Sequence, residues 1–445
     1  MGKVLLMTVG VGTKEKKEKS MESQAHGIAF AIKETTPDKI IFLVTKESTE
    51  TLDYVEKYLE DDKENKLRFI RSEKIELTTF SNINTLVKEI SDIFEKIKHH
   101  KIVVIPTFGT KAMSIGLSIA GVLYNAEIYS IEGDRGEDNL VIPGTERLEQ
   151  QNLWWIKNVF LLEKAKASFN AGRFGLAMEY LNQITKTKEF KEIVSNMETI
   201  IQSYEEWDRF NHKKAYEKMR ELPKDKIELY RLNKNFKFLE TLYSLSRKVE
   251  NIEDESQIRE TKSKIFIHLI FDLYSNAIRR FKEGKYDDCM ARFYRIIEFI
   301  GQYILWRDYN IVVSEAFGEL SEVSIWYDLK IKSNIEDKIS FEEFEKKYFN
   351  EEGKLKIGLN QCYSLLEDLG VKIIDDENQF KKILYQRNNS ILAHGSQPIK
   401  KESCEEAKEF VENLLKFLCK KENIDFEEIK EMTTFIKLPE SARLL

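Results

Sequence analysis

The sequence predicts a chain of two parts, a doubly wound α/β sheet in the first third and an α-helical region in the remainder. Short, nearly continuous apolar runs alternate with helical patterns up to about residue 148. From about residue 149 onward, long helical patterns dominate and strand patterns almost disappear. Strand–helix alternation is typical of a parallel sheet covered by helices on both faces. A chain of 445 residues is also long enough for two or three domains, each with its own core.

The elements of the first part follow from its apolar runs, which are rich in β-branched residues and suit strands buried on both faces. The expected strands are KVLLMTV (3–9), KIIFLVT (39–45), KIVVIPT (101–107) and AEIYSI (126–131), with a further strand within 67–80. The expected helices between them cover 20–34, 47–60, 83–98 and 111–123. Together these elements predict a Rossmann-like sheet.

The helical part contains one short motif twice. The segments 165–181 (AKASFNAGRFGLAMEYL) and 276–294 (NAIRRFKEGKYDDCMARFY) share the pattern G-[RK]-[FY]-x-x-[AC]-M. Each predicts two helices joined at a glycine, Gly172 or Gly284, with the following aromatic residue packed into the corner. Because a solenoid needs at least about three repeats, we interpret these segments as two helical hairpins.

Composition excludes several classes of protein. The net charge of −6 provides no global basic field, so any nucleic-acid chemistry must come from a local site. The four cysteines form no CxxC pair, which argues against disulfides and a zinc site. No apolar run reaches 18 residues, and the N-terminal run is too short for a signal peptide. We therefore expect a cytoplasmic protein with no membrane partner.

The stretch RNNSILAHG (387–395) carries the candidate catalytic residues. A helical stripe of apolar residues upstream continues through positions 387 and 394, which places Arg387 and His394 where a helix over 378–394 would bury leucines. Gly395 is the expected C-cap of that helix. Seven residues make nearly two turns, so the two side chains are expected on one face, about 10.5 Å apart along the axis. A symmetry-related second chain could combine both pairs in one composite pocket.

A guanidinium on a core stripe needs an acidic partner, a hydrated interface or an anionic ligand. Arginine stays charged and matches a phosphate, whereas histidine titrates near neutral pH and can move a proton. RNA supplies its own nucleophile, the 2′-hydroxyl, so such a pair needs no metal, and the sequence offers no cluster of metal ligands. From the spacing alone, the alternative is a structural pair held by a nearby carboxylate and the helix dipole.

Two loops that follow strands are candidate anion-binding sites. After the first strand, VGVGT offers the backbone N–H groups of Gly10, Val11 and Gly12 and the hydroxyl of Thr13. As a dinucleotide fingerprint it fails, because Glu15 occupies the third glycine position, and a simple tight turn is the alternative reading.

The second loop lies in PTFGTKAMSIGLSIAG (106–121), where Gly109, Thr110 and Lys111 begin a helix at the end of a buried strand. Free amides, the helix dipole and a lysine charge would attract an anion there. Thr45, at the end of another strand, is expected at the same edge of the sheet, where open α/β sheets bind ligands.

These motifs resemble two known families. RNNSILAHG is similar to the active-site motif of HEPN ribonucleases, which has Arg, a polar residue that is often Asn, a short spacer and His, and the segment 288–305 also resembles a HEPN helix. The resemblance implies that Arg387 stabilises the scissile phosphate, that Asn388 orients the site and that His394 handles the proton. The loop 107–113 resembles that of CARF domains, commonly T-G-G-T-K-x-M, with Phe108 replacing the first glycine.

The order of the two motifs resembles the CARF–HEPN ancillary ribonucleases of type III CRISPR systems. This resemblance implies a CARF effector-binding domain over 1–148, a helical linker region over 149–262 and a HEPN ribonuclease domain over 263–445. It further implies a homodimer, activated by a cyclic oligoadenylate, that cleaves single-stranded RNA without a metal or other cofactor and has no DNA partner.

Other functions stay open at this point. Hydroxyls at strand ends, those of Thr8, Thr13, Thr45 and Thr110, could assist cleavage of the activator itself. The chain could instead be a nucleotide-sensing regulator whose helical half only binds a partner, although the presence of both Arg387 and His394 argues against this. A metabolic nucleotide-binding enzyme is disfavoured by the broken glycine fingerprint.

Overall fold

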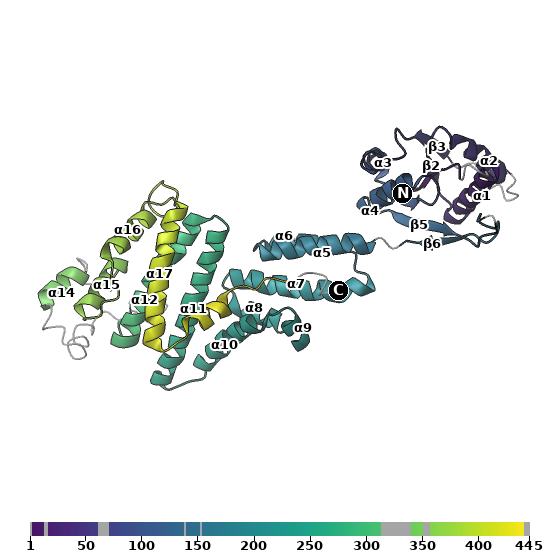
Figure 1. Ribbon diagram of the computed structural model, residues 1–445. Coiled ribbons are helices and arrows are strands. Elements are labelled where there is room, and N and C mark those ends of the chain that lie inside the picture. Colours follow the sequence, from purple (N-terminus) through teal and green to yellow (C-terminus); the bar gives the residue numbers. More distant parts are fainter. Residues whose placement is uncertain are drawn as a thin grey trace. The chain divides into compact units, whose positions relative to one another are not determined.

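The computed structural model describes residues 2–12, 17–60, 71–137, 139–151, 154–312, 340–349 and 357–439. It divides into two compact units, Met1–Leu162 and Glu163–Leu445. The first unit is built on a six-stranded sheet and the second is helical, as Figure 1 shows for each unit. The predicted fold class, an α/β part followed by an α-helical part, is therefore confirmed.

The first unit forms a mostly parallel sheet in the order β3-β2-β1-β4-β5-β6. Strands β1 to β5 pair in parallel, and β6 pairs with β5 in the antiparallel direction. The strands are β1 (Lys3–Thr8), β2 (Lys39–Val44), β3 (Arg71–Glu76), β4 (Lys101–Ile105), β5 (Glu127–Glu132) and β6 (Arg147–Gln150), and the helices are α1 (Lys17–Thr35), α2 (Thr49–Glu60), α3 (Ile83–Ile97) and α4 (Lys111–Leu123). Five strands were predicted. The sixth, the short polar segment RLEQ, carries no strand pattern.

Helices cover both faces of this sheet, which explains the nearly continuous apolar strands. Leu6 of β1 packs in a core with α3 and α4, whereas its neighbours Leu5 and Met7 pack in a second core with α1 and α2. The edge strand β3, RSEKIE, is mostly exposed and charged, which disfavours pairing with another sheet. The strand order reverses between β1 and β4, so the carboxyl ends of these two strands flank the crevice in which such sheets bind ligands.

The second unit is built from helices that meet at tight corners. Its helices are α5 (Trp154–Asn170), which the unit boundary crosses, α6 (Phe174–Asn182), α7 (Lys188–Asp208), α8 (His212–Met219), α9 (Lys224–Leu229), α10 (Asn233–Val249), α11 (Glu255–Lys282), α12 (Tyr286–Tyr309), α14 (Phe341–Tyr348), α15 (Leu359–Asp368), α16 (Glu377–Asn388), α17 (Lys401–Glu422) and α18 (Phe426–Thr433).

Both predicted helical hairpins are confirmed. Gly172 and Gly284 have φ values of 73° and 74°, a left-handed conformation that glycine adopts without strain. At each corner the glycine N–H and the next N–H bond back to carbonyls of the preceding helix. Phe174, which follows the first corner, is buried and lies with its ring centroid 5.6 Å from that of Phe169.

The chain repeats this corner with residues other than glycine. Phe210, between α7 and α8, and Arg231, between α9 and α10, have φ values of 61° and 60° and the same pair of backward hydrogen bonds. A left-handed Phe or Arg is uncommon, so the sequence carries no signal for these two turns.

The C-terminal segment after α18 returns across the hairpins, and Figure 1 shows it beside α7. The buried Asn235 amide donates to the carbonyls of Met432 (2.8 Å) and Thr434 (2.9 Å) and accepts from the hydroxyl of Tyr204 (2.5 Å). Leu438 donates its backbone N–H to the side chain of Asn170 at 2.8 Å. These hydrogen bonds fix the segment against α5 and α10.

Candidate functional site

The stretch 387–395 is a helix end followed by a turn, and the predicted helix over 378–394 is wrong beyond residue 388. Helix α16 ends at Asn388, and residues 391–394 form a turn, so His394 shares no helical face with Arg387. The helix stops because Ser390 pairs with Gln397 instead, and the Asn389 carbonyl accepts the Gln397 N–H at 3.2 Å. The stripe pattern could not reveal this local pairing.

The turn brings His394 back to the end of α16. The His394 N–H donates to the carbonyl of Asn388 at 3.2 Å, and the Gly395 N–H donates to that of Ser390 at 3.1 Å. A Cβ atom at Gly395 would lie 2.1 Å from the Asn389 carbonyl oxygen. The prediction that Gly395 caps the helix is therefore wrong. Gly395 instead permits the close approach of two backbone segments.

Arg387, in the last turn of α16, lies over an aromatic ring of α12. Its guanidinium carbon is 4.3 Å from the ring centroid of Tyr294, and its Nη1 donates to the side chain of Asn388 at 3.1 Å. Burial raises the pKa of Tyr294, Glu298 adds to the rise, and the Arg387 charge opposes it. A ring face attracts a cation without neutralising it, so the Arg387 charge stays available.

No carboxylate pairs with Arg387 among the residues that the structure describes, nor does His394 have a side-chain partner there. The carboxylate partner of the structural alternative is therefore absent from the described chain, whereas Arg387 does lie in the last turn of α16, where the helix dipole favours a cation. His394 is exposed and Arg387 half-buried. The pair is chemically a proton-transfer group beside an uncompensated, delocalised cation.

Large apolar side chains surround this turn and face solvent. Tyr385, Ile391 and Leu392 are 70%, 62% and 56% exposed. Such residues normally lie inside a protein, and a contiguous exposed group of them marks an interaction surface.

In the first unit, the two predicted ligand loops come together at the strand-order reversal. A Cβ atom at Gly10 would lie 2.9 Å from the backbone of Gly109, so the loops after β1 and β4 touch. Thr51 donates to the Gly10 carbonyl at 2.7 Å. The amide of Gln24 on α1, oriented to satisfy both groups, donates to the same carbonyl and accepts from the Gly12 N–H. Gln24 was not foreseen, because a lone Gln on a helix carries no signal.

The loop after β4 has room for its unusual phenylalanine. Phe108 packs against α1 where Gly27 lies, and a Cβ atom at Gly27 would come within 2.8 Å of the Phe108 ring. Gly109 has a φ of 114°, which only glycine adopts readily. Thr110 caps α4 by accepting from the Met113 N–H at 3.3 Å, so the helix N-terminus forms where predicted.

The charged and hydroxyl groups at this edge of the sheet differ in their exposure and in their hydrogen bonding. Lys111 is exposed at the first position of α4 and forms no ion pair within the described chain. Thr45 accepts from the Ser48 N–H at 3.2 Å, and Thr110 donates to the Phe80 carbonyl at 2.7 Å. The Thr8 hydroxyl is buried and has no hydrogen-bond partner in the described part of the chain. Val11 is half-buried in the loop after β1, and Thr13 lies outside the described residues.

Helix α4 also presents an apolar stripe to solvent. Ile115, Ile119 and Leu123 recur every four residues and are 45%, 40% and 62% exposed. Across the residues described, no three His, Cys, Asp or Glu side chains cluster in a way that could hold a metal ion. None of the helices described combines the length and apolarity needed to span a bilayer.

Comparison with known proteins identifies the family. Residues 161–252 match the family model of the Csm6 6H domain, and residues 258–418 match that of the Csm6 HEPN domain. Two consecutive domains of one family thus account for more than half of the chain. The chain belongs to the Csm6 family, the CARF–HEPN ancillary proteins of type III CRISPR systems. The middle helices, for which the sequence suggested no family, correspond to the 6H domain.

A solved structure of Csm6 has the same fold. Enterococcus italicus Csm6 bound to cyclic hexa-2′-fluoro-hexa-dAMP is 11% identical, with a TM-score of 0.54 over 97% of this chain and 97% of that chain. Can2 from Sulfobacillus thermosulfidooxidans in complex with cyclic tetra-adenylate is 13% identical over 44% of this chain and 57% of that chain, with a TM-score of 0.23. No curated protein sequence matches this chain.

Proposed function

We propose that this chain is an endoribonuclease that cleaves single-stranded RNA when a cyclic oligoadenylate binds its first unit. It acts as a homodimer and needs no metal. In the division that we propose, residues 1–148 bind the activator, 149–262 form the linking helices and 263–445 cleave the RNA. The cyclic nucleotide named with Enterococcus italicus Csm6 and the match to the Csm6 HEPN domain support this proposal.

The chemistry follows from the residues at the turn. The ribose 2′-hydroxyl attacks the adjacent phosphorus, the bond from phosphorus to the 5′-oxygen breaks, and the products are a 2′,3′-cyclic phosphate and a 5′-hydroxyl. His394 transfers a proton at one of the two oxygens, and Arg387 stabilises the negative charge that develops on the phosphate. Asn388, which accepts from the Arg387 guanidinium, orients it.

A second copy of the chain completes the site. One copy provides a single histidine, whereas general acid–base cleavage uses one group to remove a proton and another to supply one. The apolar side chains of Tyr385, Ile391 and Leu392 around the turn would be covered by the partner copy. In the first unit, the exposed stripe of α4 supports the same assembly.

The activator would bind between the loops after β1 and β4. A phosphate there would meet backbone N–H groups of the 10–12 loop, the N-terminus of α4 and the charge of Lys111. The Thr110 hydroxyl already donates to the Phe80 carbonyl and the Thr8 hydroxyl is buried, so neither is placed to assist cleavage of the activator. We therefore assign this edge a binding role.

The observation that carries the proposal is the uncompensated Arg387 guanidinium on Tyr294, beside an exposed His394. His394→Ala should abolish activator-dependent RNA cleavage and leave activator binding unchanged. His99→Ala, at an exposed position of the first unit, is the matched control and should cleave normally. If His394→Ala cleaves like the wild type, the catalytic assignment is wrong. If the wild type binds activator but never cleaves RNA, the chain is a nucleotide-sensing regulator.

A further inference from the structure

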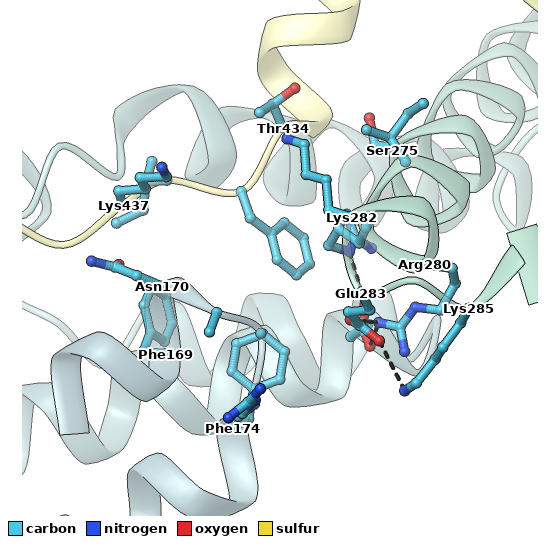
Figure 2. Close-up of a pocket in the computed structure, with 18 of the residues that line it drawn as sticks. Phe169, Asn170, Phe174, Ser275, Arg280, Lys282, Glu283, Lys285, Thr434 and Lys437 are labelled. Carbon is cyan, nitrogen blue, oxygen red and sulfur yellow. Dashed lines mark hydrogen bonds and ion pairs between the residues drawn. The ribbon is translucent and has the colours of Figure 1, made fainter. Parts of the chain in front are cut away.

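The second unit contains a large cavity that the proposed nuclease site does not use. It has a volume of about 1090 Å³ and is lined by both hairpin corners, by the ends of α7 and α11, by α17 and α18 and by the C-terminal segment. The two copies of the motif that the sequence repeats thus form two walls of one cavity. Figure 2 shows Phe169, Asn170 and Phe174 of one corner, with Glu283 and Lys285 of the other.

The cavity is strongly basic although the chain is acidic overall. Nine basic and four acidic side chains line it. The basic ones are Arg173, Arg209, Arg279, Arg280, Lys282, Lys285, Lys408, Lys430 and Lys437, and the acidic ones are Glu205, Asp208, Glu283 and Glu412. An excess of five positive charges in one concave site, within a protein of net charge −6, is a local anion-attracting field.

The acidic side chains are already engaged and cannot neutralise this excess. Asp208 pairs with Arg279 at 2.8 Å and with Arg280 at 2.7 Å. Glu283 bridges Arg280 at 3.1 Å and Lys285 at 2.8 Å, as the dashed lines in Figure 2 show. Glu412 and Glu205 likewise pair with cations of the cavity.

Three cations remain, one on each wall. Arg173 lies at the first corner, Lys282 at the second and Lys437 on the C-terminal segment, and none forms an ion pair within the described chain. All three side chains are exposed, so their charges do not take part in the packing of the fold and are accessible to a ligand.

Buried donors without acceptors lie in the same wall. Both terminal nitrogens of Arg279 and the Nε of Arg280 are buried and have no hydrogen-bond partner in the described part of the chain. The Arg279 guanidinium lies 3.6 Å from the ring centroid of Phe435, and burial lowers its pKa despite the opposing charges of Asp272 and Asp208. These unpaired donors add positive charge to the wall that Asp208 does not fully offset.

We propose that this cavity binds a small phosphate-bearing nucleotide, with its phosphates between Arg173, Lys282 and Lys437. Ligand pockets are typically about 300–1,000 Å³, so the cavity has room for such a molecule. Arginine and lysine supply charge-assisted hydrogen bonds to phosphate oxygens. The apolar side chains of Leu176, Ile278 and Ile436 offer a wall for the base and sugar. This site lies in the second unit and is separate from the activator loops of the first.

A bound nucleotide would connect three segments that are distant in sequence. It would contact the α5–α6 corner, the α11–α12 corner and the C-terminal segment, and α12 also carries Tyr294 beneath Arg387. Ligand binding to the folded state raises the melting temperature, which gives a readout independent of RNA cleavage.

The test measures binding of ATP to the full-length protein by calorimetry and by thermal shift. The double variant Lys282→Glu/Lys437→Glu reverses two exposed charges without touching the buried Arg279, and it should bind ATP at least tenfold more weakly than the wild type. Lys224→Glu, exposed in the same unit but outside the cavity, should bind like the wild type. Lys111→Glu, in the first unit, should also retain binding, which separates this site from the activator loops.

Three results would overturn the proposal. One is the absence of saturable ATP binding up to millimolar concentration. Another is unchanged affinity in Lys282→Glu/Lys437→Glu, and circular dichroism of this variant establishes that it is folded. The third is that the wild type binds an uncleavable single-stranded RNA but not ATP, and that Lys282→Glu/Lys437→Glu loses this RNA binding. That result would make the cavity a path for the substrate.

Discussion

The turn that carries His394 depends on a glycine, and replacing it gives the sharpest test of the site geometry. In Gly395→Ala the new Cβ atom would lie 2.1 Å from the Asn389 carbonyl oxygen and 2.6 Å from its Cα atom. Real Cβ contacts under 3.0 Å do not occur, so the two strands of the turn must separate by about 1 Å. The clashing atoms of Asn389 belong to its backbone and not to the tip of a flexible side chain. The strain therefore cannot be relieved without moving His394.

Gly395→Ala should have a small effect on stability and a large effect on the rate of RNA cleavage. Local strain of this kind costs about 1–3 kcal/mol, and the turn is exposed, so the domain stays folded. A displacement of about 1 Å at a catalytic group costs on the order of 10²-fold in rate. We expect kcat/KM for RNA to fall about 100-fold and the melting temperature to fall by only a few degrees.

The assay compares activator-dependent cleavage of a labelled RNA by Gly395→Ala and by Gly175→Ala. Gly175 is a matched control, because a Cβ atom there would meet nothing within 4 Å. Gly175→Ala should cleave at the wild-type rate. Activity of Gly395→Ala within threefold of the wild type would refute the claim that this turn positions His394.

Three further predictions follow from the contacts described. Tyr294→Leu removes the ring beneath Arg387, and loss of a cation–π contact of about 0.5–2 kcal/mol should lower kcat/KM roughly 2- to 30-fold. An unchanged rate would show that the ring does not position the arginine. Lys111→Glu should raise the activator concentration for half-maximal cleavage about tenfold without changing the maximal rate, and an activation curve that overlays the wild type would remove Lys111 from the activator site. Asn235→Ala leaves two carbonyls and the Tyr204 hydroxyl unpaired, so urea unfolding should show a loss of roughly 2–4 kcal/mol, against little change for Asn251→Ala at the exposed end of α10. A loss in Asn235→Ala below 1 kcal/mol would mean that the C-terminal segment is not held by this side chain.

Much of the fold could be read from the sequence because its central strands are buried on both faces. Four strands stand out as apolar runs, and the two glycine corners stand out as a repeated motif. The fifth predicted strand, within 67–80, corresponds to β3, which is mostly charged and exposed. The corners at Phe210 and Arg231 could not be found, because their left-handed conformation is imposed by packing and leaves no residue signature.

For the candidate residues, the sequence predicted a helical arrangement that the structure does not show. Residues Arg387, Asn388 and His394 lie close together, yet through a turn and not along a helix. Periodicity cannot distinguish a continuing helix from a turn closed by the backbone of Ser390 and Gln397. The ring of Tyr294 was missed because it comes from α12, and contacts between distant segments are visible only in the folded chain.

The most direct test of the central claim is to identify what the activated protein cleaves and which ends it leaves. Wild-type protein is incubated with a cyclic oligoadenylate, excess chelator and either a labelled RNA or a DNA of the same sequence. The proposed mechanism predicts that the RNA is cut to fragments with 5′-hydroxyl and 2′,3′-cyclic phosphate ends and that the DNA stays intact, because only RNA carries the 2′-hydroxyl nucleophile. Equal cleavage of the DNA, or RNA fragments with 5′-phosphate ends, would contradict it.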